Sequence, residues 1–219
     1  MLEAHTKIID FIRSLYPGIH PVPLHAPVFL GNEKKYLEDC INTTFVSYVG
    51  KNVTQFEEQI ATFTGARYAV AMMNGTTALQ IALQLAGVER GNEVITQALS
   101  FVATANAISH AGGIPVFIDV DTDTLGMSPE KLRVWLELNS KIDEKTGQCI
   151  NKTSGNTISA IIPMHTFGHP CRIVEIIEVA DEYGIQVIED AAESLGSYYR
   201  GKHTGTFGLL GILGFNGNK

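Results

Sequence analysis

The feature that most constrains the fold is a regular alternation of short apolar runs with helical segments between residues 68 and 190. The runs have the length of buried strands and lie at residues 68–73, 93–96, 115–119, 158–164 and 185–190. Helices are expected between them at 78–86, 101–108, 128–138 and 172–183. Because parallel strands need a crossover between them, this order predicts an α/β fold with a mostly parallel central sheet.

The N-terminal region has a different character. Residues 3–15 have the spacing of a short amphipathic helix, and residues 17–27 form an extended linker with four prolines. We therefore predict an arm over residues 1–27 and one α/β domain over residues 28–219. Within that domain, Thr54 and Glu57 predict a capping box for a helix that ends at Gly65, and the polar stretch 139–156 predicts an irregular surface excursion.

The last predicted strand ends on Asp190, and the chain ends on a Gly/Asn-rich segment with Lys219 as its final residue. Open α/β sheets bind ligands at the carboxyl ends of their strands, and a lysine amine can act as a nucleophile. On residue type alone, Asp190 is as readily an acid at a strand end without a role in a site as it is a site residue. Lys219 alone is more typical of a solvated surface charge. Together they predict a pyridoxal phosphate (PLP) site, because this cofactor needs a lysine Schiff base and a carboxylate that keeps its ring nitrogen protonated.

A second candidate element is the small-residue turn between the predicted strand 68–73 and the helix that follows it. Here Gly75, Thr76 and Thr77 come after Asn74 at the expected helix start. Free backbone N–H groups and the helix dipole favour a phosphate at such a place. Simple N-capping of the helix explains the same residues, and residue types alone leave both interpretations open.

Three further side chains lie next to predicted strand ends. Phe101 can present a flat apolar face to a ligand or pack in the core. His165 is on residue type alone more typical of a hydrogen-bonded structural histidine, and Glu193 of a surface acid.

Three segments in order resemble one known family: residues 188–196 (IEDAAESLG), 205–208 (GTFG) and 215–219 (FNGNK). The chain from about Pro27 to its last residue resembles the DegT/DnrJ/EryC1/StrS family of PLP-dependent nucleotide-sugar aminotransferases. Within that family, four segments are similar to the branch that aminates 4-keto-6-deoxy-N-acetylhexosamines for legionaminic-acid-type or bacillosamine-type sugars. They are residues 23–27 (PLHAP), 45–47 (FVS), 74–79 (NGTTAL) and 165–170 (HTFGHP).

The resemblance implies a fold and a site. It implies the large domain of an aspartate aminotransferase-like (fold type I) PLP enzyme over residues 28–219. It makes the turn with Gly75, Thr76 and Thr77 the one that holds the cofactor phosphate. Four more cofactor-binding residues besides Lys219 are implied: Phe101 stacking on the pyridine ring, His165 and Glu193 close to the cofactor, and Asp190 at the ring nitrogen.

The resemblance also implies a reaction. L-Glutamate would donate nitrogen through PLP to a nucleotide-linked 4-keto-6-deoxy sugar, with a UDP-linked N-acetylhexosamine as the expected substrate. Lys219 and Asp190 would be the catalytic residues, and a lysine rather than a histidine at position 219 favours amination over dehydration. The setting would be bacterial surface-polysaccharide or glycan biosynthesis, with a homodimer as the assembly.

Two departures from the family pattern bear on activity. Gly214 stands where the family commonly has a serine that helps to hold the phosphate, and the chain ends at Lys219 where family members continue into a C-terminal domain. We therefore expect the 219 residues alone to lack aminotransferase activity and the longer parent to be the enzyme. The alternative is a catalytically silent protein with the PLP fold.

Composition excludes several other classes. A net charge of −7 argues against a general nucleic-acid surface, and neither a membrane-spanning run nor a signal-peptide core occurs, so the cytoplasm is expected. Three widely spaced cysteines imply neither a disulfide framework nor a metal site. The phosphate motifs of nicotinamide and P-loop nucleotide sites are missing, which excludes those interpretations of the α/β pattern.

Overall fold

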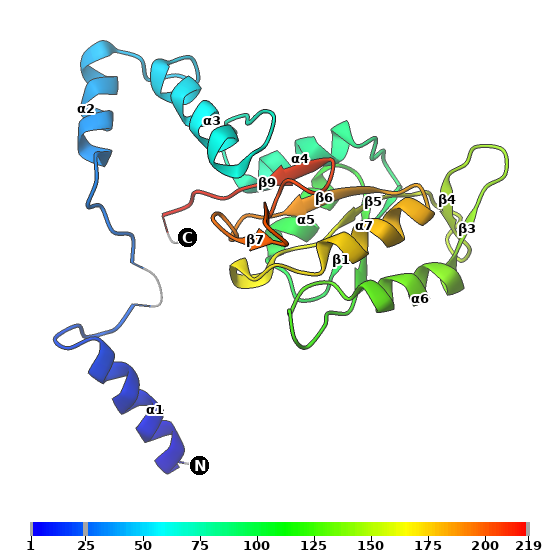
Figure 1. Cartoon of the computed structure of the whole chain (residues 1–219), viewed down its shortest axis with the longest axis horizontal. Coiled ribbons are helices and arrows are strands. Elements are labelled where there is room, and N and C mark those ends of the chain that lie inside the picture. Colours follow the sequence, from blue (N-terminus) through cyan, green and yellow to red (C-terminus); the bar gives the residue numbers. More distant parts are fainter. Residues whose placement is uncertain (1, 24–25, 218–219) are drawn as a thin grey trace.

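The computed structural model of the protein describes residues 2–23 and 26–217 (Figure 1). Its centre is a five-stranded sheet in the order β2-β1-β5-β6-β9. The strands are β1 (Glu93–Gln97), β2 (Ile114–Ile118), β5 (Ile158–Ile162), β6 (Gln186–Asp190) and β9 (Leu210–Ile212). Every pairing in this sheet is parallel, which confirms the predicted α/β class.

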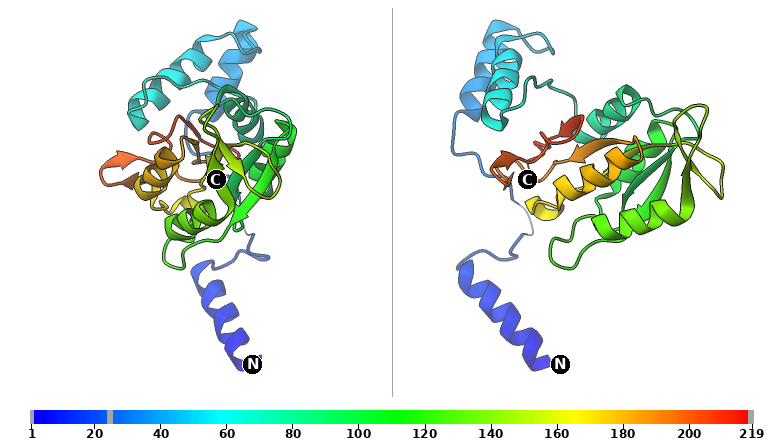
Figure 2. Two further views of the ribbon diagram at one scale, coloured as in Figure 1. Left: turned by 90° about the vertical axis from the view of Figure 1, so that its right-hand side faces the viewer. Right: turned by 45° about the vertical axis from the view of Figure 1, so that its right-hand side comes forward.

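Helices cover both faces of the sheet, as the views in Figure 2 show. The helices α4 (Gly75–Leu85) and α5 (Val102–His110) pack on one face, and α6 (Pro129–Asn139) and α7 (Ile173–Glu182) pack on the other. Adjacent strand residues point to opposite faces, so Val94 joins the core under α4 and α5 while Ile95 joins the core under α6 and α7. All four helices predicted between the strands are therefore confirmed.

Local capping explains where two of these helices begin. The Asn74 side chain accepts a hydrogen bond from the Thr77 N–H at 2.8 Å before α4, and the Ser128 hydroxyl accepts one from the Lys131 N–H at 3.3 Å before α6. Pro129 occupies the first turn of α6, where its missing N–H costs nothing.

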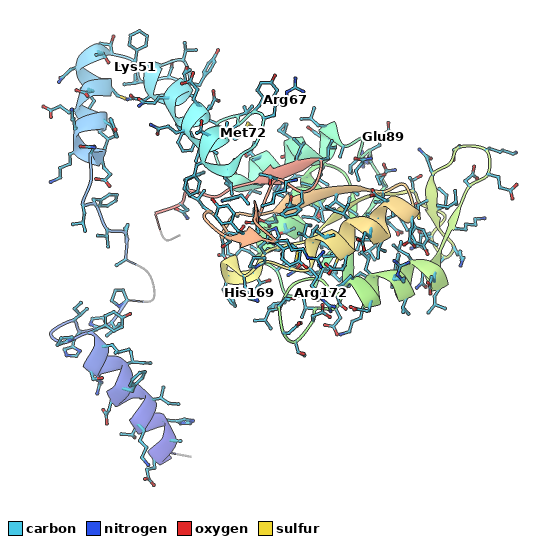
Figure 3. All side chains as sticks on the ribbon, in the orientation of Figure 1. Lys51, Arg67, Met72, Glu89, His169 and Arg172 are labelled. Atoms are coloured by element: carbon cyan, nitrogen blue, oxygen red, sulfur yellow. The ribbon has the colours of Figure 1, made fainter. Side chains whose placement is uncertain are left out.

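The strand predicted at 68–73 is wrong. This segment has no regular secondary structure and forms no ladder with any described strand, and Tyr68, Val70 and Met73 are 74%, 75% and 90% exposed. Its Ala71 N–H donates to Glu57 Oε1 at 2.7 Å, so the segment is attached to the preceding helix rather than to the sheet. Figure 3 shows Met72 on this stretch between α3 and α4. An apolar run becomes a strand only where a neighbouring strand supplies hydrogen bonds.

The predicted capping box is also wrong. The helix α3 (Lys51–Thr64) begins after Gly50, about one turn earlier than expected, so Thr54 lies inside it. Its C-terminal end is as predicted, because Gly65 adopts the left-handed conformation (φ 75°) that stops helices.

The excursion predicted at 139–156 contains a hairpin that the sequence did not reveal. Its strands are β3 (Ser140–Ile142) and β4 (Cys149–Asn151), paired antiparallel. Asn151 Nδ2 donates to Glu93 Oε2 at 2.7 Å, and Glu93 is the first residue of β1. The hairpin is thus anchored at the amino end of the sheet, where Figure 1 shows it projecting from the body.

The N-terminal arm contains the predicted helix α1 (Leu2–Leu15), which stands away from the body in Figures 1 and 2. Its apolar side chains, including Phe11 at 64% exposure, remain exposed. A second helix, α2 (Glu33–Thr43), was not predicted and buries no residue. Three further short elements are present. They are the 3-10 turn η1 (Thr166–Gly168) and the strands β7 (Tyr198–Tyr199) and β8 (Lys202–His203), which together form a two-stranded sheet. No helix in the described ranges is long and apolar enough to cross a membrane.

Candidate active site

A cavity of about 1080 Å³ lies at the carboxyl ends of the sheet. The strand order reverses between β1 and β5, and open α/β sheets bind ligands beside such a switch point. The lining combines the start of α4, the residues that follow β1 and β6, and the segment around β9. Of the residues predicted for the site, it includes Gly75, Thr76, Phe101, Asp190 and Glu193.

Asp190 is the last residue of β6 and is only 3% exposed. Its Oδ2 accepts a hydrogen bond from the Thr104 hydroxyl at 2.7 Å, and its Oδ1 accepts one from the Ala192 N–H at 3.2 Å. Donors to a carboxylate favour its charged form and fix its orientation. The predicted place of Asp190 at a buried strand end is confirmed, and its role toward a cofactor stays a prediction.

Thr104 is a residue that sequence reasoning missed. It lies on α5, is fully buried, and receives a hydrogen bond from the Ser100 hydroxyl at 2.9 Å. Hydroxyl donors therefore run from Ser100 through Thr104 to the Asp190 carboxylate. The available signal was a threonine on the apolar side of a short helix, a place where a hydroxyl needs a partner.

In the turn before α4, some groups cap the helix and others face the cavity. The two interpretations left open by the sequence, helix capping and phosphate binding, are therefore compatible. The capping bond uses the Asn74 side chain and the Thr77 amide, and Thr77 lies outside the cavity lining. Gly75 and Thr76 line the cavity at the first turn of the helix, where backbone N–H groups have no intrahelical acceptor. This end of the cavity therefore suits an anion.

Phe101 precedes α5 and is 62% exposed, with its side chain lining the cavity. The geometry thus favours the ligand-facing interpretation of this residue over core packing. Glu193 is exposed and also lines the cavity, a few residues beyond the end of β6.

His165 lies elsewhere. Its ring is fully buried outside the cavity lining, and its Nδ1 accepts a hydrogen bond from the Cys171 N–H at 3.2 Å. The proton therefore resides on Nε2, which lies 3.0 Å from Glu189 Oε2 and donates to it. Because both ring nitrogens have protein partners, the geometry favours the structural interpretation of His165, and its predicted contact with a cofactor stays untested.

Glu189 is the second residue that the sequence did not single out. It is fully buried, yet its carboxylate accepts hydrogen bonds from His165 and from three backbone amides of the turn after β8. Burial raises the pKa of Glu189, but the bonds from His165 and the Gly208 amide outweigh burial, so the pKa lies below its ordinary value. The side chain is a buried carboxylate anion held by donors.

Lys219 lies outside the described residues, so its predicted role is not tested by the structure. The segment that leads to it is described. Gly214, Phe215 and Asn216 line the cavity, and the Phe215 ring packs edge-on against Phe56 with centroids 5.0 Å apart.

Comparison with known proteins identifies the family. Residues 30–219 match the model of the DegT/DnrJ/EryC1/StrS aminotransferase family. The chain belongs to this family. This match confirms the predicted resemblance, and the solved structure of a relative confirms the aminotransferase fold.

Three relatives illustrate the family. GDP-perosamine synthase from Escherichia coli O157:H7 is 37% identical over 198 residues, covering 90% of this chain and 50% of that protein. The putative pyridoxal phosphate-dependent aminotransferase EpsN of Bacillus subtilis (strain 168) is 40% identical over 196 residues, covering 90% and 47%. The crystal structure of DesI in the presence of its TDP-sugar product matches with a TM-score of 0.75 and 30% identity, covering 92% and 47%. The chain thus spans about half the length of the relatives it matches.

Family membership and the PLP-dependent relative indicate pyridoxal phosphate as the cofactor. The cavity fits this group in three respects. It has a buried carboxylate for the ring nitrogen at Asp190, an exposed aromatic face at Phe101, and first-turn amides for the phosphate at Gly75 and Thr76.

Proposed function

We propose that this chain provides the PLP-binding part of an enzyme that transfers nitrogen from L-glutamate to a nucleotide-linked 4-keto-6-deoxy sugar. The observation that carries the proposal is the pairing of two features in one cavity. The buried, hydrogen-bonded carboxylate of Asp190 and the first turn of α4 line the same space at the carboxyl edge of the sheet.

Each residue has a distinct task in the proposal. Bound PLP supplies an electron sink that lets a proton and an amino group be exchanged between donor and acceptor. Asp190 holds the ring nitrogen protonated, Phe101 covers one ring face, and the amides of Gly75 and Thr76 bind the phosphate. Lys219 anchors the cofactor and moves the proton with its free amine.

The substrate class is supported by the names of the relatives. One relative is a GDP-perosamine synthase, and the DesI structure contains a TDP-sugar product. We propose a UDP-linked 4-keto-6-deoxy-N-acetylhexosamine for this protein because residues 74–79 and 165–170 are similar to the branch that aminates such sugars. We further propose action in the cytoplasm, as a homodimer, in the synthesis of surface glycans.

The cofactor assignment is tested by borohydride reduction of protein purified with PLP, followed by peptide mass analysis. The expected result is a pyridoxyl adduct on Lys219 in the wild-type chain. Asp190→Asn keeps the shape of the side chain but removes its charge, and it should lower PLP affinity by about tenfold or more, the scale of a lost charge-assisted hydrogen bond. Asp181→Asn, an exposed acid on α7, is the matched control and should bind PLP like the wild type.

The substrate assignment needs a separate measurement. In the longer parent protein, L-glutamate should convert bound PLP to its amino form and release 2-oxoglutarate. The loaded parent protein should then aminate the UDP-linked keto sugar in preference to a GDP-linked one. Preference for the GDP-linked sugar would move the assignment to another substrate branch. An adduct without exchange by glutamate would instead support the catalytically silent alternative.

A further inference from the structure

Glu189 holds an unusual concentration of hydrogen bonds for a side chain with no exposure to solvent. Its Oε1 accepts from the N–H groups of Phe207 at 2.6 Å and Gly208 at 2.8 Å. Its Oε2 accepts from the N–H of Gly205 at 2.8 Å and from His165 Nε2 at 3.0 Å. Each carboxylate oxygen thus receives two donors, and three of the four donors come from one turn.

This arrangement depends on the negative charge of Glu189. A buried carboxylate is tolerated only when donors compensate for its lost hydration, and backbone amides do so for the charged form. Conversely, the amides of the half-buried residues Gly205, Phe207 and Gly208 would lose their acceptor if the carboxylate were removed. The turn and the carboxylate therefore stabilise each other.

The turn lies directly on β6. A Cβ added to Gly208 would lie 2.5 Å from the Val187 carbonyl oxygen, and one added to Gly211 would lie 1.9 Å from the Gly205 carbonyl oxygen. Such distances leave room only for glycine. The turn then enters β9, where Gly211 is paired with Glu189 and Ile212 with Asp190.

Glu189 does not face the cavity. Along β6, Ile188 belongs to the core under α4 and α5 and Val187 to the core under α6 and α7, so Asp190 and Glu189 point to opposite faces. Asp190 lines the cavity and Glu189 does not. Any influence of Glu189 on the site must pass through the turn and β9, which continues into the cavity-lining residues Leu213 to Asn216.

We propose that Glu189 is a positioning residue that fixes the turn at residues 205–208 and thereby the course of the cavity-lining residues Leu213 to Asn216, which lead toward Lys219. This inference rests on the proposed function for the role of Lys219. The attachment of the turn itself does not. His165 supports the arrangement by donating to the same carboxylate.

The first test is amide hydrogen exchange on the 219-residue chain with Glu189→Gln. This variant keeps the size of the side chain but replaces one acceptor oxygen by an NH2 group that cannot accept. The amides of Gly205, Phe207 and Gly208 should exchange at least tenfold faster, while amides of β1 and β5 keep their protection. Glu178→Gln, an exposed glutamate on α7, is the matched control and should change neither group.

The second test compares cofactor binding with covalent attachment. In Glu189→Gln, non-covalent PLP affinity should stay within about threefold of wild type, because Asp190, Phe101 and α4 are unchanged. The yield of borohydride-trapped adduct on Lys219 should fall at least tenfold. A purely structural role would lower both quantities together or neither.

The outcomes separate the two proposals. Unchanged exchange at the three amides, or an unchanged adduct yield in a folded variant, overturns the positioning role. A wild-type chain that forms no adduct refutes the proposed function, while the exchange experiment still decides whether Glu189 holds the turn. If Glu189→Gln does not fold, Glu189→Asp keeps the charge with a shorter reach and should accelerate exchange at the same three amides.

Discussion

At the residue scale, the Asp190 carboxylate is oriented by a hydroxyl from another element. The Thr104 hydroxyl accepts a hydrogen bond from the half-buried Ser100 and donates one to Asp190 at 2.7 Å, and both Thr104 and Asp190 are buried. Such a bond is worth more than an ordinary one, because the acceptor is charged and removed from water.

We predict that Thr104→Val lowers the free energy of unfolding by about 2 kcal/mol, the scale of a hydrogen bond to a charged group. Valine keeps the volume and shape of threonine, so the loss reports the hydroxyl rather than packing. Thr104→Ser keeps the hydroxyl and loses a methyl group, which costs about 1 kcal/mol. Urea unfolding without PLP measures both, and a valine variant as stable as the serine variant would contradict this account of Asp190.

Sequence reasoning reached only part of this site. Asp190, Phe101, Gly75 and Thr76, which it named, line one cavity, because strand ends and helix starts of a parallel sheet meet at the same edge. Their roles toward a cofactor stay predictions. It did not reveal Thr104, which lies 86 residues from its partner in the chain. A hydrogen bond between residues so far apart in the chain produces no recognisable pattern in the local sequence.

At the scale of elements, β9 lies in close backbone contact with the turn that precedes it. Gly211 in β9 has the Gly205 carbonyl oxygen where a side chain would begin. A side chain at position 211 would therefore require β9 or the turn to move.

We predict that Gly211→Ala destabilises the protein by about 3 kcal/mol, since overpacking against backbone cannot be relieved by a rotamer change. Gly50→Ala is the control, because an added Cβ there meets only the Phe45 Cβ at 3.8 Å, and its cost should be about 1 kcal/mol or less. Thermal or urea unfolding of the two variants measures both losses of stability. Equal stability of both variants would show that β9 or the turn at residues 205–208 can shift at little cost.

The elements that the sequence predicted well are those with local causes. The helices α4 and α6 start at their capping residues Asn74 and Ser128, and each signal lies within four residues of its effect. The segment 68–73 has the apolar content of a strand, but a strand also needs a partner, and that requirement is not local. The charged group that attaches this segment, Glu57, was assigned instead to a cap.

At the scale of the whole molecule, the arm and the α/β body differ in how they are stabilised. Both buried cores consist of residues from Ala78 onward, as far as the described residues show. The apolar face of α1, with Ile8, Phe11 and Ile12, remains exposed.

We therefore predict that a chain beginning at residue 28 unfolds with a free energy within about 0.5 kcal/mol of the full chain, because surface groups outside the cores contribute little. Matched urea titrations of the two chains, followed by tryptophan fluorescence of Trp135, provide the measurement. A loss of several kcal/mol would mean that the arm packs on the body in solution, and the predicted boundary between arm and domain would then need revision.

The β3–β4 hairpin is a suitable point for attaching the protein to a surface. It is anchored to Glu93 at the amino end of the sheet, whereas the cavity lies at the carboxyl end. Glu144 is exposed near the tip of the hairpin. A biotin attached at this position would immobilise the protein on a sensor surface with the cavity turned toward the solution, open to any small molecule that flows past.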